Sequence, residues 1–129
     1  MEAISNNIKG GRIMPQLRIK GIEAEKILSI SKELVDELTE IVECPRDYFT
    51  IECIDTTSIF DGEFVETYPF VEVAWFDRGQ KVQDRVAKII ATYINQLGVQ
   101  DVEIAFVVFK ENSYYENGKI VFTLPQESS

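Results

Sequence analysis

The sequence predicts an α+β fold, a two-layer α/β sandwich in which two strand-helix-strand units share one mixed four-stranded sheet with both helices on one face. Two long stretches repeat apolar residues at helical spacing, and short stretches of alternating apolar and polar residues precede and follow each of them. Each helical stretch has a single apolar stripe, so it can cover only one sheet face. We expect residues 1–13 to be a polar extension, residues 14–123 a single domain and residues 124–129 a tail.

The first unit begins with a short strand, in which Leu17 and Ile19 alternate with polar residues until Gly21. A helix is predicted over residues 23–42, ending before Pro45 because the residue that precedes a proline disfavours the helical conformation. A second strand is predicted from Phe49 toward Ile59. The apolar stripe of the helix consists of Ile27, Ile30, Leu34, Leu38, Ile41 and Val42.

The second unit starts after a predicted tight hairpin at Asp61-Gly62, for which an ordinary loop is the alternative. A central strand over residues 70–76 leads to a helix over residues 80–97, with Asp77 as its cap and Gln80 three residues on. Another strand covers residues 102–108, and Asn117-Gly118 predicts a small C-terminal hairpin.

The sheet face without helices should be too apolar for a monomer surface and too acidic for a dry core. We therefore expect it to pack against other subunits. The predicted residues of this face are Glu52, Glu72, Glu103, Phe70, Phe76, Val107 and Phe109.

Charge and composition exclude several classes of function. The formal net charge of −9 opposes binding to nucleic acids and anionic membranes. The chain has no histidine, which removes imidazole metal sites and histidine-activated nucleophiles, and its two cysteines form no metal-ligand or redox spacing. We expect no metal and no cofactor. The low cysteine count and the absence of a long apolar run or a signal pattern favour a cytoplasmic protein.

Three short motifs in a characteristic order carry a family resemblance. The segment Met14-Pro15-Gln16-Leu17-Arg18-Ile19 is followed by a helix, then by Cys44-Pro45-Arg46-Asp47-Tyr48 before a strand, then by Trp75-Phe76-Asp77-Arg78 before the second helix. In this order the chain resembles the tautomerase superfamily of 4-oxalocrotonate tautomerase and macrophage migration inhibitory factor, especially its bacterial members with long subunits. The resemblance implies a homotrimer whose sheets enclose a central barrel, active sites at subunit boundaries, and cofactor-independent proton transfer by an amino-terminal proline.

Pro15 is the catalytic residue that the resemblance implies, and its chemistry requires a free amine. In an apolar pocket near a cation, a secondary amine loses part of its preference for the charged form, so it can act as a base near neutral pH. As written, however, Pro15 is internal and its nitrogen is an amide. Lys9-Gly10-Gly11-Arg12 is what a translated ribosome-binding sequence would encode, and a start at Met14 with methionine removal would expose Pro15. The alternative is a genuine extension, with Pro15 merely opening a strand.

Four further residues are candidates for binding a small-molecule carboxylate substrate. Arg78, at a strand-helix junction, could hold the carboxylate through two hydrogen bonds, or it could be a solvated first-turn arginine. Tyr48 could donate to a substrate oxygen or close the core, Arg46 adds a cation near the same sheet edge, and Phe76 could wall the pocket. Together with these residues, the resemblance implies a tautomerase acting on a small 2-oxo acid, with a non-catalytic trimeric binding module as the alternative.

Overall fold

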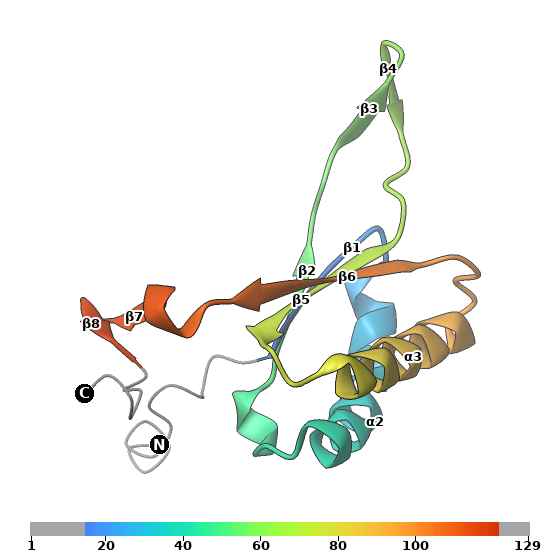
Figure 1. Cartoon of the computed structure of the whole chain (residues 1–129). Helices are drawn as coiled ribbons and strands as arrows, with labels where there is room; N and C mark the ends of the chain where they lie inside the picture. The colour runs from blue at the N-terminus through green and yellow to red at the C-terminus, as the bar shows by residue number, and fades with distance from the viewer. Residues whose placement is uncertain (1–14, 122–129) are drawn as a thin grey trace, which may run out of the picture.

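The computed structural model describes residues 15–121, which contain one four-stranded sheet covered on one face by two helices (Figure 1). The expected extension over residues 1–13, the start at Met14 and the tail over residues 124–129 lie outside the described residues. The sheet consists of β1 (Gln16–Lys20), β2 (Thr50–Ile54), β5 (Phe70–Phe76) and β6 (Glu103–Phe109), in the order β2-β1-β5-β6. β1 is parallel to β2 and antiparallel to β5, and β5 is parallel to β6, so the predicted mixed sheet is confirmed.

The two helices, α2 (Ala24–Val42) and α3 (Gln80–Gln96), lie together beneath the same face of the sheet (Figure 1). Their apolar stripes meet the sheet residues Leu17, Val73 and Trp75 in one core, as the alternation in the strands requires. The most deeply buried members of this core are Leu17, Ile19, Leu34, Leu38, Val71, Val73, Trp75, Ile90 and Ile94.

The helix ends show where the predictions held and where one was wrong. α2 ends at Val42, and Glu43 adopts a left-handed conformation while its N–H donates to the Thr39 carbonyl, before the chain reaches the proline. The predicted Asp77 cap of α3 is wrong, because Gly79 has φ of 92° and α3 begins only after it. The Asp77 Oδ1 instead accepts a hydrogen bond from the Gly79 N–H at 2.9 Å, which forms a local turn before the helix.

The predicted strand from Phe49 toward Ile59 is divided. β2 stops at Ile54 because its partner β1 ends at Lys20, the residue opposite Ile54 in the register, and Gly21 then turns the chain away. Beyond Ile54 the sheet offers β2 no further partner strand. The chain continues into a projecting hairpin, residues 55–69, which we call the arm.

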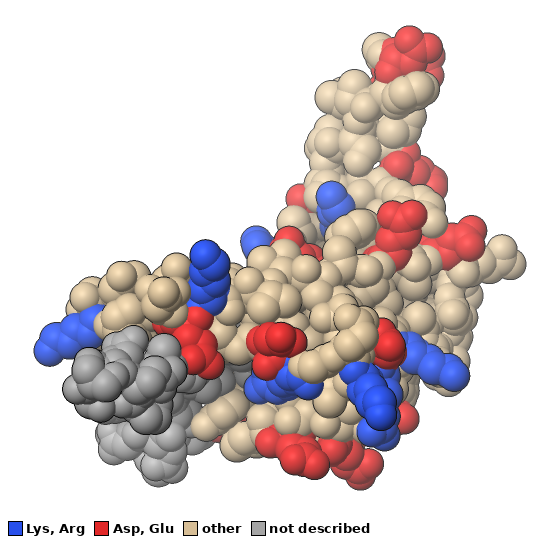
Figure 2. Space-filling model, in the orientation of Figure 1, with Lys and Arg blue, Asp and Glu red and all other residues tan. Residues whose placement is uncertain are grey.

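The arm contains β3 (Ser58–Phe60) and β4 (Glu63–Val65), joined at Asp61-Gly62 as predicted, with φ values of 54° and 79° at these two residues. It stands away from both the sheet and the helices (Figure 1), and its tip is acidic (Figure 2). Three of its apolar side chains are largely exposed: Ile59 (66%), Phe60 (73%) and Phe64 (80%). An isolated two-stranded hairpin is marginally stable in water, so we expect these exposed apolar side chains to pack against another surface.

The second predicted hairpin is also present. Asn117 and Gly118, with φ of 53° and 81°, connect β7 (Tyr115–Glu116) to β8 (Lys119–Ile120). It follows β6 and a short 3-10 helix, η2 (Glu111–Ser113), and lies at the end of the sheet opposite the arm (Figure 1).

The face without helices, which we call the open face, has the mixed character that the sequence predicts. Arg18 lies between Glu52 and Glu72 of the neighbouring strands, with its nitrogens 3.4 and 3.7 Å from their carboxylate oxygens. Apolar side chains occupy other positions of the same face, and Val107 is exposed. Neither helix of the described residues is long and apolar enough to cross a membrane.

Candidate active site

The candidate site lies where β1 begins and β5 ends, at the end of the sheet away from the arm. Gln16 is opposite Ala74 in the antiparallel pair, so continuing the register by one residue sets Pro15 opposite Trp75. Pro15 is fully buried, and its carbonyl accepts a hydrogen bond of 3.1 Å from the Thr50 N–H at the start of β2. β1 is thus fixed between β2 and β5 up to its first residue.

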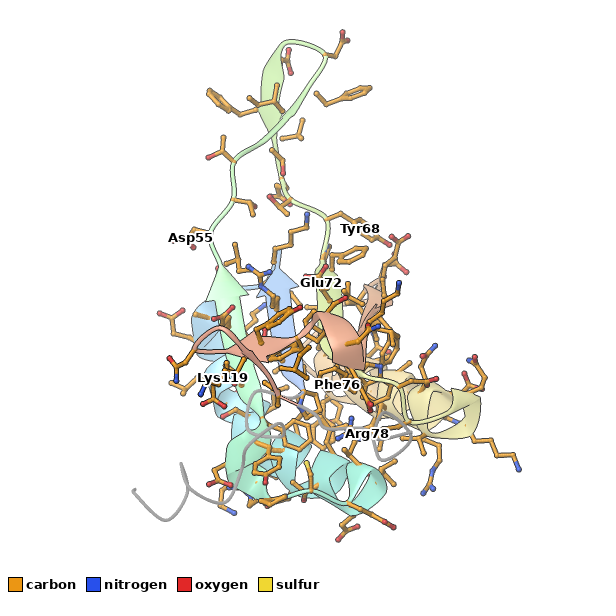
Figure 3. The ribbon with its side chains drawn as sticks, turned by 60° about the vertical axis from the view of Figure 1, so that its left-hand side comes forward. Asp55, Tyr68, Glu72, Phe76, Arg78 and Lys119 are labelled. Carbon is orange, nitrogen blue, oxygen red and sulfur yellow. The ribbon has the colours of Figure 1, made fainter. Side chains whose placement is uncertain are left out.

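Arg78 lies two residues after the end of β5, and its guanidinium folds back over the strand end. The Nη1 donates to the Phe76 carbonyl at 3.1 Å, and the Cζ lies 5.5 Å from the centre of the Trp75 ring. Figure 3 shows Arg78 and Phe76 close together, at the sheet end opposite Asp55 and Tyr68 at the base of the arm.

The guanidinium of Arg78 is half-buried and has no carboxylate partner among the residues that the structure describes. None of the ion pairs between residues 15 and 121 involves Arg78. Burial lowers its pKa, while the nearby Cys44 acts in the opposite direction. Burial raises the pKa of the Cys44 thiol, and the Arg78 charge works against that shift. A half-buried cation without a counter-ion is a site that favours an anion, and its planar guanidinium suits a carboxylate.

Trp75, in β5, is also part of this site. Its ring is fully buried and packs against Phe106, with the ring centres 5.0 Å apart. Its Nε1 is buried without a hydrogen-bond partner among the described residues. The residue type predicts burial, but only the three-dimensional packing reveals the unused donor.

Phe76 lies on the other side of the sheet from Trp75, as strand alternation requires. It is nearly buried and forms edge contacts with Phe109, at 5.8 Å between ring centres, and Tyr114, at 5.2 Å. The predicted pocket wall is therefore part of an aromatic cluster at the C-terminal end of β6.

Arg46 and Tyr48 both lie in η1 (Arg46–Tyr48), the 3-10 helix before β2. The guanidinium of Arg46 points to α2, where its Nε donates to Asp36 Oδ1 at 2.8 Å and its Nη2 to the Lys32 carbonyl at 3.3 Å. Tyr48 is half-buried, and its backbone N–H donates to the Pro45 carbonyl. Arg78 makes no hydrogen bond or ring contact with either residue within the described part of the chain.

The surface of residues 15–121 also has hollows outside this site. A cavity of about 440 Å³ separates α2 from β2, lined among others by Ile27, Leu28, Ile51 and Cys53. Another, of about 290 Å³, lies on the open face around Arg18 and Phe70. Within residues 15–121, no group of three histidine, cysteine, aspartate or glutamate side chains is placed to hold a metal ion.

Comparisons with known proteins identify the family. Residues 14–120 match the family model described as Domain of unknown function (DUF1904). A crystal structure of a DUF1904 domain from Sebaldella termitidis is 40% identical, with 81% of this chain and 97% of that chain covered and a TM-score of 0.74. A protein of unknown function from Vibrio cholerae is 33% identical, with coverage of 89% and 93% and a TM-score of 0.74. No curated protein matches the chain.

More distant structures share the fold. A macrophage migration inhibitory factor-like protein from Entamoeba histolytica is 18% identical over 82% of this chain and 97% of that chain, with a TM-score of 0.62. A protein called Pt0534, solved after inactivation by 2-oxo-3-pentynoate, is 14% identical over 82% and 94%, with a TM-score of 0.65. The chain therefore belongs to the DUF1904 family, and its fold is that of the tautomerase superfamily.

Proposed function

We propose that the protein is a cofactor-independent tautomerase that moves a proton on a small 2-oxo acid, with Pro15 as base when it is the amino terminus and Arg78 as the carboxylate-binding group. The half-buried guanidinium of Arg78, without a carboxylate partner among the described residues, carries this proposal. This guanidinium provides an anion site at the end of β5, where Trp75 lies opposite Pro15.

The position of Pro15 supports the catalytic role. Pro15 lies at the first position before β1, across from Trp75, and Arg78 lies over the ring of that same tryptophan. The family match begins at Met14, one residue earlier. The core of the described residues runs from Leu17 to Ile94, so a chain that begins at Pro15 retains it.

The chemistry follows from these two groups. In the enol-to-keto direction, the protonated Pro15 amine delivers a proton to C3 of the substrate while the enol oxygen releases its proton to solvent. In the reverse direction the neutral amine takes the C3 proton and the oxygen is protonated. Arg78 holds the carboxylate so that C3 lies within reach of the proline nitrogen, which removes the entropic cost of bringing the groups together.

A binding module is the second candidate, and the amide nitrogen of an internal Pro15 favours it. In a chain that retains residues 1–14, no free amine exists at this position. The Arg78 site could still bind a carboxylate without turning it over. The two functions differ in one observable, which is turnover by a chain that starts at Pro15.

We also propose that the subunits assemble into a homotrimer through the open face and the arm. The open face carries apolar side chains such as Val107 that neither helix covers. The arm exposes Ile59, Phe60 and Phe64, and the apolar cavity between α2 and β2 is large enough to receive such a side chain from a second copy. Light scattering at micromolar concentration should give the mass of three chains, and a monomer mass would contradict this assembly.

The test of catalysis compares the full chain with a chain that begins at Pro15. Both are assayed for ketonisation of the enol form of phenylpyruvate and of 2-hydroxymuconate. We expect turnover only from the chain that begins at Pro15, because only its proline is a secondary amine. Equal turnover by the full chain would overturn the proline mechanism.

A covalent probe gives a second measurement. 2-Oxo-3-pentynoate carries an activated alkyne, so a neutral secondary amine adds to its C4 while C3 takes the proton, and the protein gains the full mass of the reagent. We expect this adduct at Pro15 in the shorter chain and none there in the full chain. Arg78→Ala should slow labelling and turnover, whereas Arg85→Ala, which removes an exposed arginine of α3, is the matched control and should leave both unchanged.

A further inference from the structure

The indole N–H of Trp75 is an unused hydrogen-bond donor in the interior of the protein. Among the described residues, its Nε1 is the buried side-chain nitrogen or oxygen that lacks a partner. Buried donors in native proteins are nearly always paired, and an unpaired one requires an explanation. An indole nitrogen can only donate, so its missing partner must be an acceptor.

The unused donor lies beside the unused cation. The Arg78 guanidinium lies over the ring whose edge carries the free N–H, with its Cζ 5.5 Å from the ring centre. Phe106 occupies another side of the ring. A cation without an anion and a donor without an acceptor thus adjoin one another at the strand end that faces Pro15.

A 2-oxo acid satisfies both groups at once. Its carboxylate oxygens suit the guanidinium, and its oxo oxygen, on the adjacent carbon, is a neutral acceptor. Arg78 is half-exposed, and among the described residues its side chain is held by a hydrogen bond to the Phe76 carbonyl, so it can move to admit the ligand. A donor aimed at the oxo oxygen also stabilises the negative charge that develops there as an enolate forms.

We propose that the Trp75 N–H donates a hydrogen bond to the 2-oxo oxygen of a ligand whose carboxylate is bound by Arg78, so that Trp75 selects 2-oxo acids over simple carboxylic acids. This role rests on the proposed function, since it requires Arg78 to bind the carboxylate. A site built around a hydrogen bond discriminates against an analogue that lacks the bonded atom. Trp75 then determines specificity, while Arg78 binds both kinds of acid.

The chain has one tryptophan, so its indole resonance and any replacement of the residue are site-specific. In the chain that begins at Pro15, labelled with ¹⁵N, we expect 2-oxobutanoate to move the single indole N–H cross-peak downfield. Butanoate, which has the same chain without the oxo group, should move it much less. An indole peak that responds equally to the two acids overturns the proposal.

The decisive experiment measures calorimetric affinities for this pair of acids in wild type, in Trp75→Phe and in protein where benzothienylalanine replaces tryptophan. The last replacement keeps the ring shape and removes only the N–H, so it remains informative where Trp75→Phe fails to fold. We expect wild type to prefer 2-oxobutanoate by about tenfold and both replacements to lose that preference, with butanoate affinity unchanged. A preference that survives loss of the N–H, or an equal loss for both acids, overturns the role of Trp75 while leaving carboxylate binding by Arg78 in place. Failure of wild type to bind either acid refutes the Arg78 site itself, and with it the proposed function.

Discussion

A comparison of Arg78 with Arg46 can distinguish an arginine that binds ligand from one that only stabilises the fold. Arg46 has a carboxylate partner, Asp36, at 2.8 Å, whereas Arg78 has none among residues 15–121. Replacing each by methionine keeps most of the apolar stem and removes the charge. We expect Arg78→Met to weaken ligand binding strongly and Arg46→Met to leave it almost unchanged, while both variants keep a free energy of unfolding within about 1 kcal/mol of wild type.

The magnitudes follow from the contacts. Arg78→Met loses one hydrogen bond to a carbonyl, worth about 0.5–1.5 kcal/mol, and a contact with the Trp75 ring worth about 0.5–1 kcal/mol. It also removes a half-buried, unpaired charge whose burial lowers its own pKa, so the two effects oppose each other and the net change stays within about 1 kcal/mol of zero. Arg46→Met loses a half-exposed ion pair and a carbonyl bond, together about 1 kcal/mol.

Ligand binding, unlike stability, should separate the two variants. A charge-assisted hydrogen bond contributes about 1.5–3 kcal/mol, so loss of Arg78 should weaken carboxylate binding by about 10- to 150-fold. Arg46→Met should change it by less than about twofold, since its guanidinium is directed to α2. Urea unfolding at one protein concentration and calorimetric titration with 2-oxobutanoate measure the two quantities. A large loss of stability in Arg78→Met with unchanged binding would refute the assignment of Arg78 to the site.

Three further outcomes test the fold. Gly21→Ala should lower the free energy of unfolding by about 2 kcal/mol more than Gly98→Ala. Both glycines have positive φ, but of the two only Gly21 would bring its new Cβ against a backbone carbonyl oxygen, at 2.7 Å. Equal losses of stability in urea unfolding would contradict this clash. The hydrogen bond from Arg46 lowers the pKa of Asp36 below its ordinary 3.8, so its stabilising effect exists above that value and is lost as the pH falls through the folded-state pKa. Asp36→Asn should therefore unfold at lower urea than wild type near neutral pH, and the two unfolding curves should converge as the pH falls below 3.8. Val107→Asp, on the open face, should give a smaller assembly in light scattering without unfolding the subunit, and an unchanged mass would place the interface elsewhere.

The sheet and the helices could be predicted from sequence because their signals are local. Leu17 and Ile19 alternate with polar neighbours within five residues, and the stripes of α2 and α3 repeat within single turns. The composition of the open face could also be predicted from sequence. Successive strand residues point to opposite faces of the sheet, so the residues that do not face the helices must lie on the open face. The end of β2 could not be predicted this way, since it depends on where its partner β1 stops pairing.

The candidate site was less accessible to sequence reasoning because its contacts join distant parts of the chain. The residue type of Arg46 indicates a cation near the sheet edge, but its partner Asp36 lies 10 residues earlier in the chain, on α2. Arg78 is a candidate from sequence because of its position between a strand and a helix, where ligand sites occur in α/β structures. The open hydrogen-bonding capacity of Trp75 has no sequence signal, since it is a property of what the packing leaves unpaired.

The two unsatisfied groups at this strand end are informative because each is unfavourable for folding. Within residues 15–121 the half-buried guanidinium has no counter-ion and the buried N–H has no acceptor; both destabilise the unliganded subunit, and an apolar residue at either position would avoid the penalty. Elsewhere in the described chain, Arg18 and Arg46 have carboxylate partners, and no charged side chain is buried in the core. Local rules of folding tend to be broken where a protein functions, since stability and function compete there. Both exceptions meet on one tryptophan, opposite the proline that the proposed mechanism requires, and for this reason we place the proposed site at the junction of β1, β5 and α3.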